Sequence, residues 1–482
     1  MSTYICIDLG ATSGRITEVN FNKGKISLKT SGRFLTEGTQ IPYDKGSKLI
    51  WDIPNFWKQI KEILVNIKEA DSIAVDSWGV DFSLLDKEGR LMTLPTHYRD
   101  LEHLNMAEDV IKKLGAYRIH KETGIQIMPI NTLYQIYALW KNSPHLIENS
   151  SSLLMISDLF TYFLSGEKIS EYTIATSTQM YNTAKDQWAK TMLENLGLPT
   201  HYLLPVTKPG KVIGKIHPFL NFLKNTEVVA TASHDTASAI ACIPMEEDSI
   251  YISSGTWSLV GTQIDKPLIN EKTLEYEFTN EGGLNKITFL QNITGMWIFE
   301  ECRRQWNQTV EKFMKVENIK LSSVINVDDK IFQTPGDMPK KIADYCIETG
   351  QKIPQDTQQT VRTIFESLAL KYRWVIENIE KLTNKKYSKI HIVGGGAKNE
   401  ILNQLTANVT GKIVIAGPWE ATTIGSAIIQ MLALGHINTI DEGREIVRNS
   451  FEFKTYNPCK DLSLEDKYSF LSKLLNEKRR EK

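Results

Sequence analysis

The chain has 482 residues, of which 41% are hydrophobic, and its 56 Lys and Arg residues are balanced by 57 Asp and Glu residues. This length exceeds what one hydrophobic core usually supports, so we expect two large domains. The balanced charge argues against a nucleic-acid-binding surface, and we expect no nucleic-acid partner.

The first ten residues predict a strand that begins at once, not a signal peptide. No stretch is apolar over the length needed to span a bilayer, so we expect no membrane partner. The five cysteines are scattered without metal-ligand spacing, which indicates reduced thiols. These features together predict a cytoplasmic protein.

The first half of the chain alternates strand and helix patterns. The expected elements are strands over 4–7, 15–21 and 25–34, a helix over 54–70 with apolar residues at helical spacing, and a buried strand over 72–75. A small polar turn over 9–14 joins the first two strands. This order predicts an α/β layer fold.

The second half repeats this opening in a weaker form. We expect strands over 249–253 and 257–263 joined by a turn at 254–256, then a helix over 361–382, a strand over 389–393 and a helix over 420–434. We interpret the likeness as a duplication of one fold. The predicted domains are 1–244, for sugar and phosphate, and 245–482, for the nucleotide, with a cleft between them.

The segment from Asp8 to Arg15 has the composition of an anion-binding turn. A carboxylate at the end of a strand can hold a hydrated Mg²⁺, so Asp8 is the candidate metal residue. Glycines let backbone N–H groups approach an anion closely, and Thr12, Ser13 and Arg15 add donors and charge. An ordinary hairpin turn explains the same residues equally well.

Two glycine-containing turns in the second half have related properties. The turn at 254–256 is small and polar, although such turns are more often structural than functional. Glycines 394–396 follow a predicted strand and precede a helix, which is typical of ligand-binding turns. The chain contains no G-x-x-x-x-G-K-[ST] motif and no G-x-G-x-x-G after a strand, which excludes a P-loop enzyme and disfavours a dinucleotide-binding dehydrogenase.

A His-Asp-Thr cluster lies close to the predicted domain boundary. Asp235, between His234 and Thr236, can accept a proton from a hydroxyl nucleophile and is the candidate catalytic base. The alternative is that Ser233 or Asp235 only caps the following helix. Other acidic candidates are Asp76 and Asp81, which flank Ser77-Trp-Gly-Val80, where Trp78 offers a flat face for a sugar ring.

Several of these motifs together resemble the FGGY carbohydrate kinases, whose two lobes share the actin-like (ribonuclease H-like) ATPase fold. Within that family the chain is similar to the rhamnulokinases. The matching segments, in order over nearly the whole chain, are 8–15, 76–82, 131–135, 233–238, 253–259, 279–283, 391–396 and 416–418.

The resemblance implies ATP-dependent phosphorylation of L-rhamnulose at its C1 hydroxyl, in L-rhamnose catabolism, with Mg²⁺ as cofactor. It implies that Asp235 is the base. It further implies substrate contacts from Gly79, His234, Asp235, Thr236 and Asn292. Nucleotide contacts are implied for Ala11, Thr12, Ser13, Gly14, Arg15, Thr256, Glu300 and Gly396. Glu300 departs from the family pattern, which has glutamine there, and a carboxylate cannot donate the amide's hydrogen bonds.

Three alternatives remain open at this point: a kinase for another ketose such as L-fuculose, an actin-like or Hsp70-like ATPase module without a sugar site, and a sugar sensor that has lost catalysis. The cluster at 233–238 disfavours the ATPase module, and the retained Asp8 and Asp235 disfavour the sensor. We expect a monomer or a weak homo-oligomer.

Overall fold

The computed structural model describes residues 1–44, 46–307, 309, 313, 319, 323–459 and 463–480. The chain forms two compact units whose segments are interleaved in sequence. The first unit comprises Met1–Pro244, Gln263–Phe289 and Ala421–Ser450, and the second comprises Met245–Thr262, Leu290–Glu420 and Phe451–Lys482. The two domains predicted from the sequence, 1–244 and 245–482, are continuous segments and stay a prediction.

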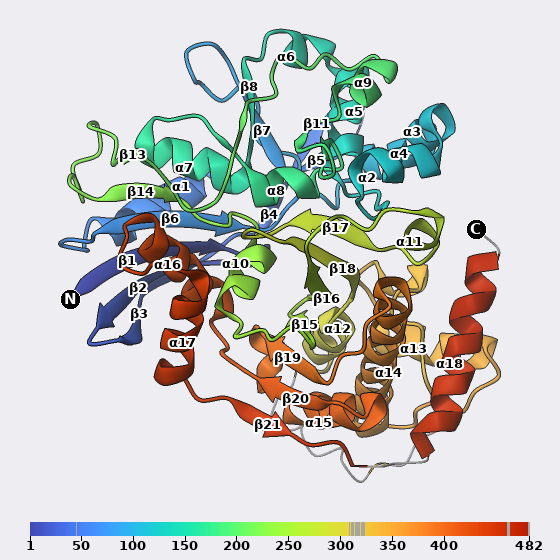
Figure 1. Ribbon diagram of the computed structural model, residues 1–482. Coiled ribbons are helices and arrows are strands. Elements are labelled where there is room, and N and C mark those ends of the chain that lie inside the picture. Colours follow the sequence, from blue (N-terminus) through green and yellow to red (C-terminus); the bar gives the residue numbers. More distant parts are fainter. Residues whose placement is uncertain are drawn as a thin grey trace. The chain divides into compact units, whose positions relative to one another are not determined.

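A six-stranded sheet lies at the centre of the first unit (Figure 1). Its strand order is β13 (Lys211–Lys215), β14 (Glu227–Ala230), β6 (Ser72–Ser77), β1 (Ser2–Leu9), β2 (Ser13–Asn22) and β3 (Lys25–Leu35). β1 pairs antiparallel with β2 and parallel with β6. The predicted strand–turn–strand opening is therefore confirmed.

Helix α1 (Ile53–Leu64) covers this sheet with an apolar face that includes Phe56 and Ile60. Asp52 caps its first turn by accepting a hydrogen bond from the backbone N–H of Asn55. The prediction extended this helix to residue 70, which was wrong. The helix ends earlier because the Asn66 side chain donates to the carbonyl of Glu62 and the backbone then turns, although Ile67 stays buried.

Two helices from the last quarter of the chain belong to the first unit. α16 (Ala421–Ala433) packs against α10 (Asp235–Cys242) and β1, and α17 (Ile440–Ser450) packs beside β3, so red and blue elements lie together in Figure 1. Gly425 permits the close approach, because a Cβ there would lie 1.7 Å from the carbonyl oxygen of Ser238.

The other elements of the first unit lie outside this sheet, and part of them form a second apolar core, which includes Leu133, Tyr134, Ile136 and Leu193. They are β4 (Gly38–Tyr43), β5 (Gly46–Trp51), β7 (Phe82–Leu85), α2 (Leu101–Leu104), α3 (Met106–Leu114), α4 (Ala116–Thr123), α5 (Thr132–Asn142), α6 (Pro144–Glu148), β8 (Ser152–Met155), α7 (Ile156–Ser165), β9 (Ser170–Glu171), α8 (Tyr172–Ser177), β10 (Tyr181–Asn182), β11 (Gln187–Trp188), α9 (Lys190–Asn195), β12 (Val206–Thr207), α11 (Glu271–Glu275) and β17 (Thr279–Gly282).

The second unit repeats the strand connectivity of the first. β15 (Ser249–Ser254) pairs antiparallel with β16 (Trp257–Ile264) and parallel with β19 (Lys389–Val393), as β1 does with β2 and β6. The order continues through β20 (Ile413–Ala416) to β21 (Lys454–Tyr456), and β18 (Ile287–Thr294) lies on the other side of β16. The predicted likeness of the two halves is therefore present in their topology.

The other described elements of the second unit are helices. The long helix α14 (Thr357–Thr383) is the one predicted over 361–382, and it is buried along most of its length. The others are α12 (Trp297–Trp306), η2 (Lys330–Phe332), α13 (Met338–Glu348), η3 (Gly395–Lys398), α15 (Glu400–Thr410) and α18 (Ser463–Arg480). Among the described residues, no helix combines the length and the apolar character needed to cross a membrane.

Candidate active site

The predicted site residues fall into two sets, one in each unit. In the first unit, Arg15, Asp8 and Asp76 occupy one register row across the adjacent strands β2, β1 and β6. Side chains in such a row point to the same face of a sheet. The Arg15 guanidinium lies 2.6 Å from the Asp8 carboxylate. Strand pairing therefore brings Asp76, which is distant in sequence, beside the Asp8–Arg15 pair.

Asp76 is the least expected member of this row. It is fully buried, and neither of its carboxylate oxygens has a hydrogen-bond partner in the described part of the chain. Burial raises its pKa well above the usual range, the charges of Asp8 and Asp235 raise it further, and Arg15 opposes them. The sequence suggested Asp76 only as an alternative base, because its proximity to Asp8 and Asp235 depends on pairing across the sheet.

The turn between β1 and β2 is shorter than predicted. It spans Gly10 to Thr12, and Gly10 closes it by donating from its N–H to the carbonyl of Ser13, 3.0 Å away. Thr12 and Ser13 are exposed and Ala11 is half-buried, so their donors are accessible. Gly14 has a packing role, since the Phe34 ring occupies the place where its Cβ would be, within 2.3 Å.

Asp235 begins helix α10 but does not cap it. His234 occupies the capping position, and no side chain there bonds to the first turn. The Asp235 carboxylate accepts one hydrogen bond, from the Thr236 hydroxyl at 3.1 Å, and its side chain remains 38% exposed. The capping interpretation is thus wrong for Asp235, and the carboxylate is accessible to a ligand.

The loop after β6 approaches this cluster closely. A Cβ on Gly79 would lie 2.9 Å from the Ser177 hydroxyl and 3.2 Å from Nε2 of His234, so a larger residue would fill the space beside the histidine. The structure therefore brings together Gly79, His234, Asp235 and Thr236, four of the five predicted substrate contacts.

Asp81 and Trp78 belong to the core. Asp81 is buried and accepts hydrogen bonds from the indoles of Trp51 and Trp78 and from the amide of Gln135. The Trp78 ring is 7% exposed and lies 4.3 Å from the Trp51 ring. The suggested sugar platform at Trp78 is therefore wrong, because its face is used in packing.

In the second unit, the turn at Gly255 and Thr256 lies against two glycine segments. A Cβ on Gly396 would lie 2.0 Å from the Ser254 hydroxyl, and one on Gly295 would lie 2.7 Å from the carbonyl oxygen of Gly255. Thr256 itself is exposed. The glycines therefore permit tight packing around a turn in which Thr256 stays exposed, as a nucleotide contact of Thr256 would need, whereas Gly396 is itself buried.

Asn292 and Glu300 lie on neighbouring elements of the second unit, Asn292 on β18 and Glu300 on α12. Asn292 is thus the one predicted sugar contact outside the first unit. The Glu300 carboxylate is paired with the Arg303 guanidinium at 2.7 Å, one turn along the same helix. The pairing offsets the negative charge that made Glu300 an unfavourable neighbour for a phosphate.

We expect Glu300→Gln to leave turnover unchanged and ATP affinity equal or a few-fold tighter. The substitution removes a charge repelled by the polyanion and frees Arg303. Calorimetric titration of ATP into both proteins measures the effect. Glu348→Gln, at an exposed position of α13, is a matched control. A large loss of ATP affinity only in the Glu300 variant would contradict the expectation.

The metal prediction can be weighed against the donors present. Among the described residues, no three Asp, Glu, His or Cys side chains are grouped to hold a metal ion directly. Mg²⁺ usually keeps several waters and takes only one or two carboxylates. The unpartnered, buried carboxylate of Asp76 beside Asp8 fits a hydrated cation of this kind.

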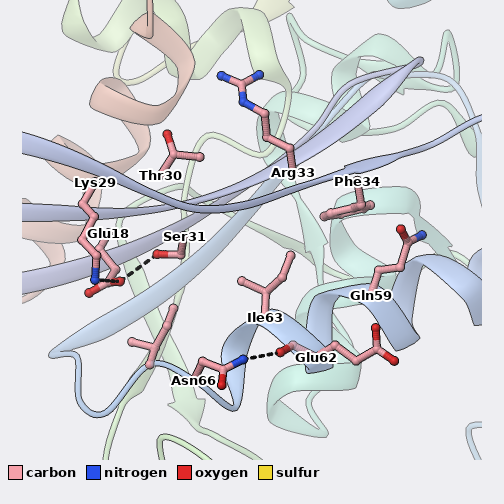
Figure 2. A pocket seen from close by; sticks show the side chains of 11 residues that line it. Glu18, Lys29, Thr30, Ser31, Arg33, Phe34, Gln59, Glu62, Ile63 and Asn66 are labelled. Carbon is pink, nitrogen blue, oxygen red and sulfur yellow. Dashed lines mark hydrogen bonds and ion pairs between the residues drawn. The ribbon is translucent and has the colours of Figure 1, made fainter.

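A separate pocket lies between β2, β3 and α1 and has a volume of about 370 Å³ (Figure 2). In its lining, Glu18 accepts hydrogen bonds from Lys29 at 2.9 Å and from Ser31 at 2.7 Å. None of the predicted site residues lines it. We assign no ligand to it.

Known protein families match both halves of the chain. Residues 3–242 match the N-terminal domain and residues 250–434 the C-terminal domain of the FGGY family of carbohydrate kinases. The chain belongs to this family, and the predicted two-domain, actin-like α/β fold is confirmed.

Among curated proteins, the chain is 39% identical to a rhamnulokinase of Oceanobacillus iheyensis, over 94% of this chain and 97% of that one. It is also 39% identical to a rhamnulokinase of Halalkalibacterium halodurans, over 95% and 99% of the two chains. Among solved structures, a ligand-bound xylulose kinase from Lactobacillus acidophilus superposes with a TM-score of 0.80 at 18% identity, covering 99% of this chain and 96% of that one.

Proposed function

We propose that this chain transfers the γ-phosphoryl group of ATP to the C1 hydroxyl of L-rhamnulose, giving L-rhamnulose 1-phosphate and ADP. The observation that carries the chemistry is the Asp235 carboxylate, which is partly exposed and does not serve as a helix cap. It lies near His234, Thr236 and Gly79. The sugar is proposed because full-length relatives at 39% identity are rhamnulokinases.

Asp235 is the proposed base. It accepts the proton of the C1 hydroxyl as that oxygen attacks the γ-phosphorus, and the bond to the β-phosphate oxygen breaks to release ADP. Phosphoryl transfer depends mainly on positioning and on neutralising charge, with little covalent chemistry for the protein. Gly79, His234 and Thr236 would hold the sugar so that its hydroxyl meets the carboxylate.

The phosphates would be bound by residues in and beside the two small turns. In the first unit these are Thr12 and Ser13, which are exposed, with Ala11, Gly14 and Arg15, and in the second unit Thr256, which is exposed, with Gly396, which packs against Ser254. Asn292 is proposed as a sugar contact and Glu300 as a neighbour of the nucleotide. Asp8 would hold hydrated Mg²⁺, which neutralises phosphate charge when bound.

Coupled ADP-release assays across a panel of ketoses test the substrate. L-Rhamnulose should give the highest kcat/KM, and ³¹P NMR of the product should show a 1-phosphate. A clear preference for L-fuculose or D-xylulose would overturn the rhamnulose assignment. Turnover of ATP without stimulation by any ketose would contradict the kinase reaction itself.

We expect Asp8→Asn to raise the Mg²⁺ concentration needed for half-maximal rate by about tenfold or more, because a carboxylate ligand is lost. The ion pair with Arg15 is lost as well. Mn²⁺ binding, followed by electron paramagnetic resonance, gives a second readout that does not depend on turnover. Glu18→Gln, which removes a carboxylate paired with Lys29 on the same sheet, is the control. An unchanged metal titration would remove Asp8 from the metal site.

The remaining assignments stay predictions. They are a cytoplasmic location, a monomer or weak homo-oligomer, and the absence of nucleic-acid and membrane partners. Size-exclusion chromatography with light scattering, over a range of protein concentrations, measures the oligomeric state.

A further inference from the structure

The His234 ring lies between two carboxylates of the first unit. Its Nδ1 is 3.3 Å from Oε2 of Glu281, and its Nε2 is 3.8 Å from Oδ1 of Asp235. Only 8% of His234 and 6% of Glu281 are exposed. The shorter contact is within hydrogen-bond range and the longer one is not. The Nδ1 atom is therefore within hydrogen-bond distance of Glu281, whereas the Nε2 atom is not within hydrogen-bond distance of Asp235.

Glu281 lies on β17, and both residues beside it are fixed by backbone hydrogen bonds. The N–H of Gly282 donates to the Thr176 hydroxyl at 2.7 Å. The N–H of Asn280 donates to the carbonyl of Gly124 at 2.8 Å. The Tyr172 ring lies within 2.5 Å of where a Cβ on Gly282 would be. The position of the Glu281 carboxylate is thus determined by contacts on both sides.

The backbone of His234 is held independently. The N–H of Ser233 donates to the Glu171 carboxylate and the N–H of His234 donates to the Thr173 hydroxyl, both at 3.1 Å. Because the backbone is held, the His234 side chain can change position only by rotating about its side-chain torsions. The contact between Nδ1 and Glu281 restricts this rotation. The ring's Nε2 edge faces Gly79, the residue whose missing side chain leaves space beside it.

We propose that Glu281 is a positioning residue for the sugar kinase reaction: it accepts the Nδ1–H of His234 and so holds the Nε2–H toward an oxygen of the bound ketose. This inference rests on the proposed function for the identity of the ligand. Glu281 does not touch the reacting atoms in this scheme and acts through the histidine.

The electrostatics of the ring agree with this geometry. Burial lowers the pKa of His234, but the hydrogen bond and charge of Glu281, together with the charges of Asp235 and Glu171, raise it to about 9. The ring is therefore an imidazolium below about pH 9 and loses its proton above it, so that both nitrogens are donors at neutral pH.

Glu281→Gln tests the proposal, with Glu275→Gln as the matched control on the same segment, where the side chain is exposed. We expect the dissociation constant for L-rhamnulose, measured by calorimetry without nucleotide, to rise about tenfold in the Glu281 variant and to stay unchanged in the control. Weakening should be greater at pH 8 than at pH 6, because the histidine then loses its proton at lower pH. Glu281→Asp, which restores the charge, should recover part of the affinity.

A measurement without sugar separates this proposal from the proposed function. In protein labelled with ¹³C at the histidine Cε1, the signal that disappears in His234→Gln belongs to His234. It should titrate above pH 8 in the wild type and at least one pH unit lower in Glu281→Gln, about one pKa unit being the loss of one close charge.

The outcomes are distinct. A neutral His234 at pH 7 in the wild type, or equal sugar affinity in Glu281→Gln and the control, would overturn the positioning role. The expected titration combined with no ketose turnover would overturn the proposed function and support the pairing of Glu281 with His234.

Discussion

Replacing Asp235 by asparagine is expected to lower kcat by about 10² to 10⁴, the range typical for removal of a general base. Asparagine keeps the size of the side chain and can still accept from Thr236, but it cannot take the hydroxyl proton. The carboxylate is 38% exposed, and its contacts are with the adjacent residues, a hydrogen bond from Thr236 and the His234 ring at 3.8 Å, so its loss should leave the fold intact. Steady-state kinetics with saturating MgATP and L-rhamnulose measure the effect.

Asp52→Asn is the matched control for this experiment. Asp52 also stands at the start of a helix in the first unit, but its side chain caps α1 through Asn55, and asparagine caps helices equally well. The control should retain wild-type kcat, and both variants should bind ATP as the wild type does. Turnover near the wild-type rate in Asp235→Asn would show that another group takes the proton.

Gly425→Ala is expected to destabilise the first unit by about 2 kcal/mol or more, from overpacking between helices. A Cβ at this position of α16 would lie 1.7 Å from the carbonyl oxygen of Ser238 and 2.7 Å from its carbon. These atoms belong to the backbone of α10, so the helices must separate. The gain in helix propensity from glycine to alanine, about 1 kcal/mol, offsets only part of this cost.

Thermal unfolding followed by circular dichroism should show a melting temperature several degrees lower. Activity should fall in the folded protein as well, because α10 begins at Asp235 and shifts with its neighbours. Gly214→Ala is the control: its new Cβ would have its nearest neighbour, the Cγ of Glu167, at 3.8 Å, an ordinary contact. Equal stability of the two variants would mean that α10 and α16 are not tightly packed at Gly425.

Much of the site was predictable from local patterns. A short apolar run and a strand pattern on either side of a small polar turn predicted β1 and β2, and a carboxylate at the end of a strand singled out Asp8. A His-Asp-Thr cluster before an alanine-rich stretch singled out Asp235. Each of these signals lies within a few residues of sequence, where the local backbone alone decides which side chains are close.

Other features depend on contacts between segments that are distant in sequence. Asp76 joins Asp8 and Arg15 because β6 pairs in register with β1, and register is determined by burial of whole strands, not by any short motif. The sequence suggested that Trp78 faces a ligand. In the structure its indole donates a hydrogen bond to Asp81 and packs against Trp51.

The sequence by itself determined the family, the strand–turn–strand units and the candidate base, because these follow from local periodicity and from motifs shared with relatives. Only the tertiary structure decided that residues 263–289 and 421–450 complete the first unit, bringing Glu281 to His234 and Gly425 to Ser238. The physical reason is that a side chain's hydrogen-bond partner and the space around a glycine are set by which backbones pack together, and that packing minimises exposed apolar surface over the whole chain.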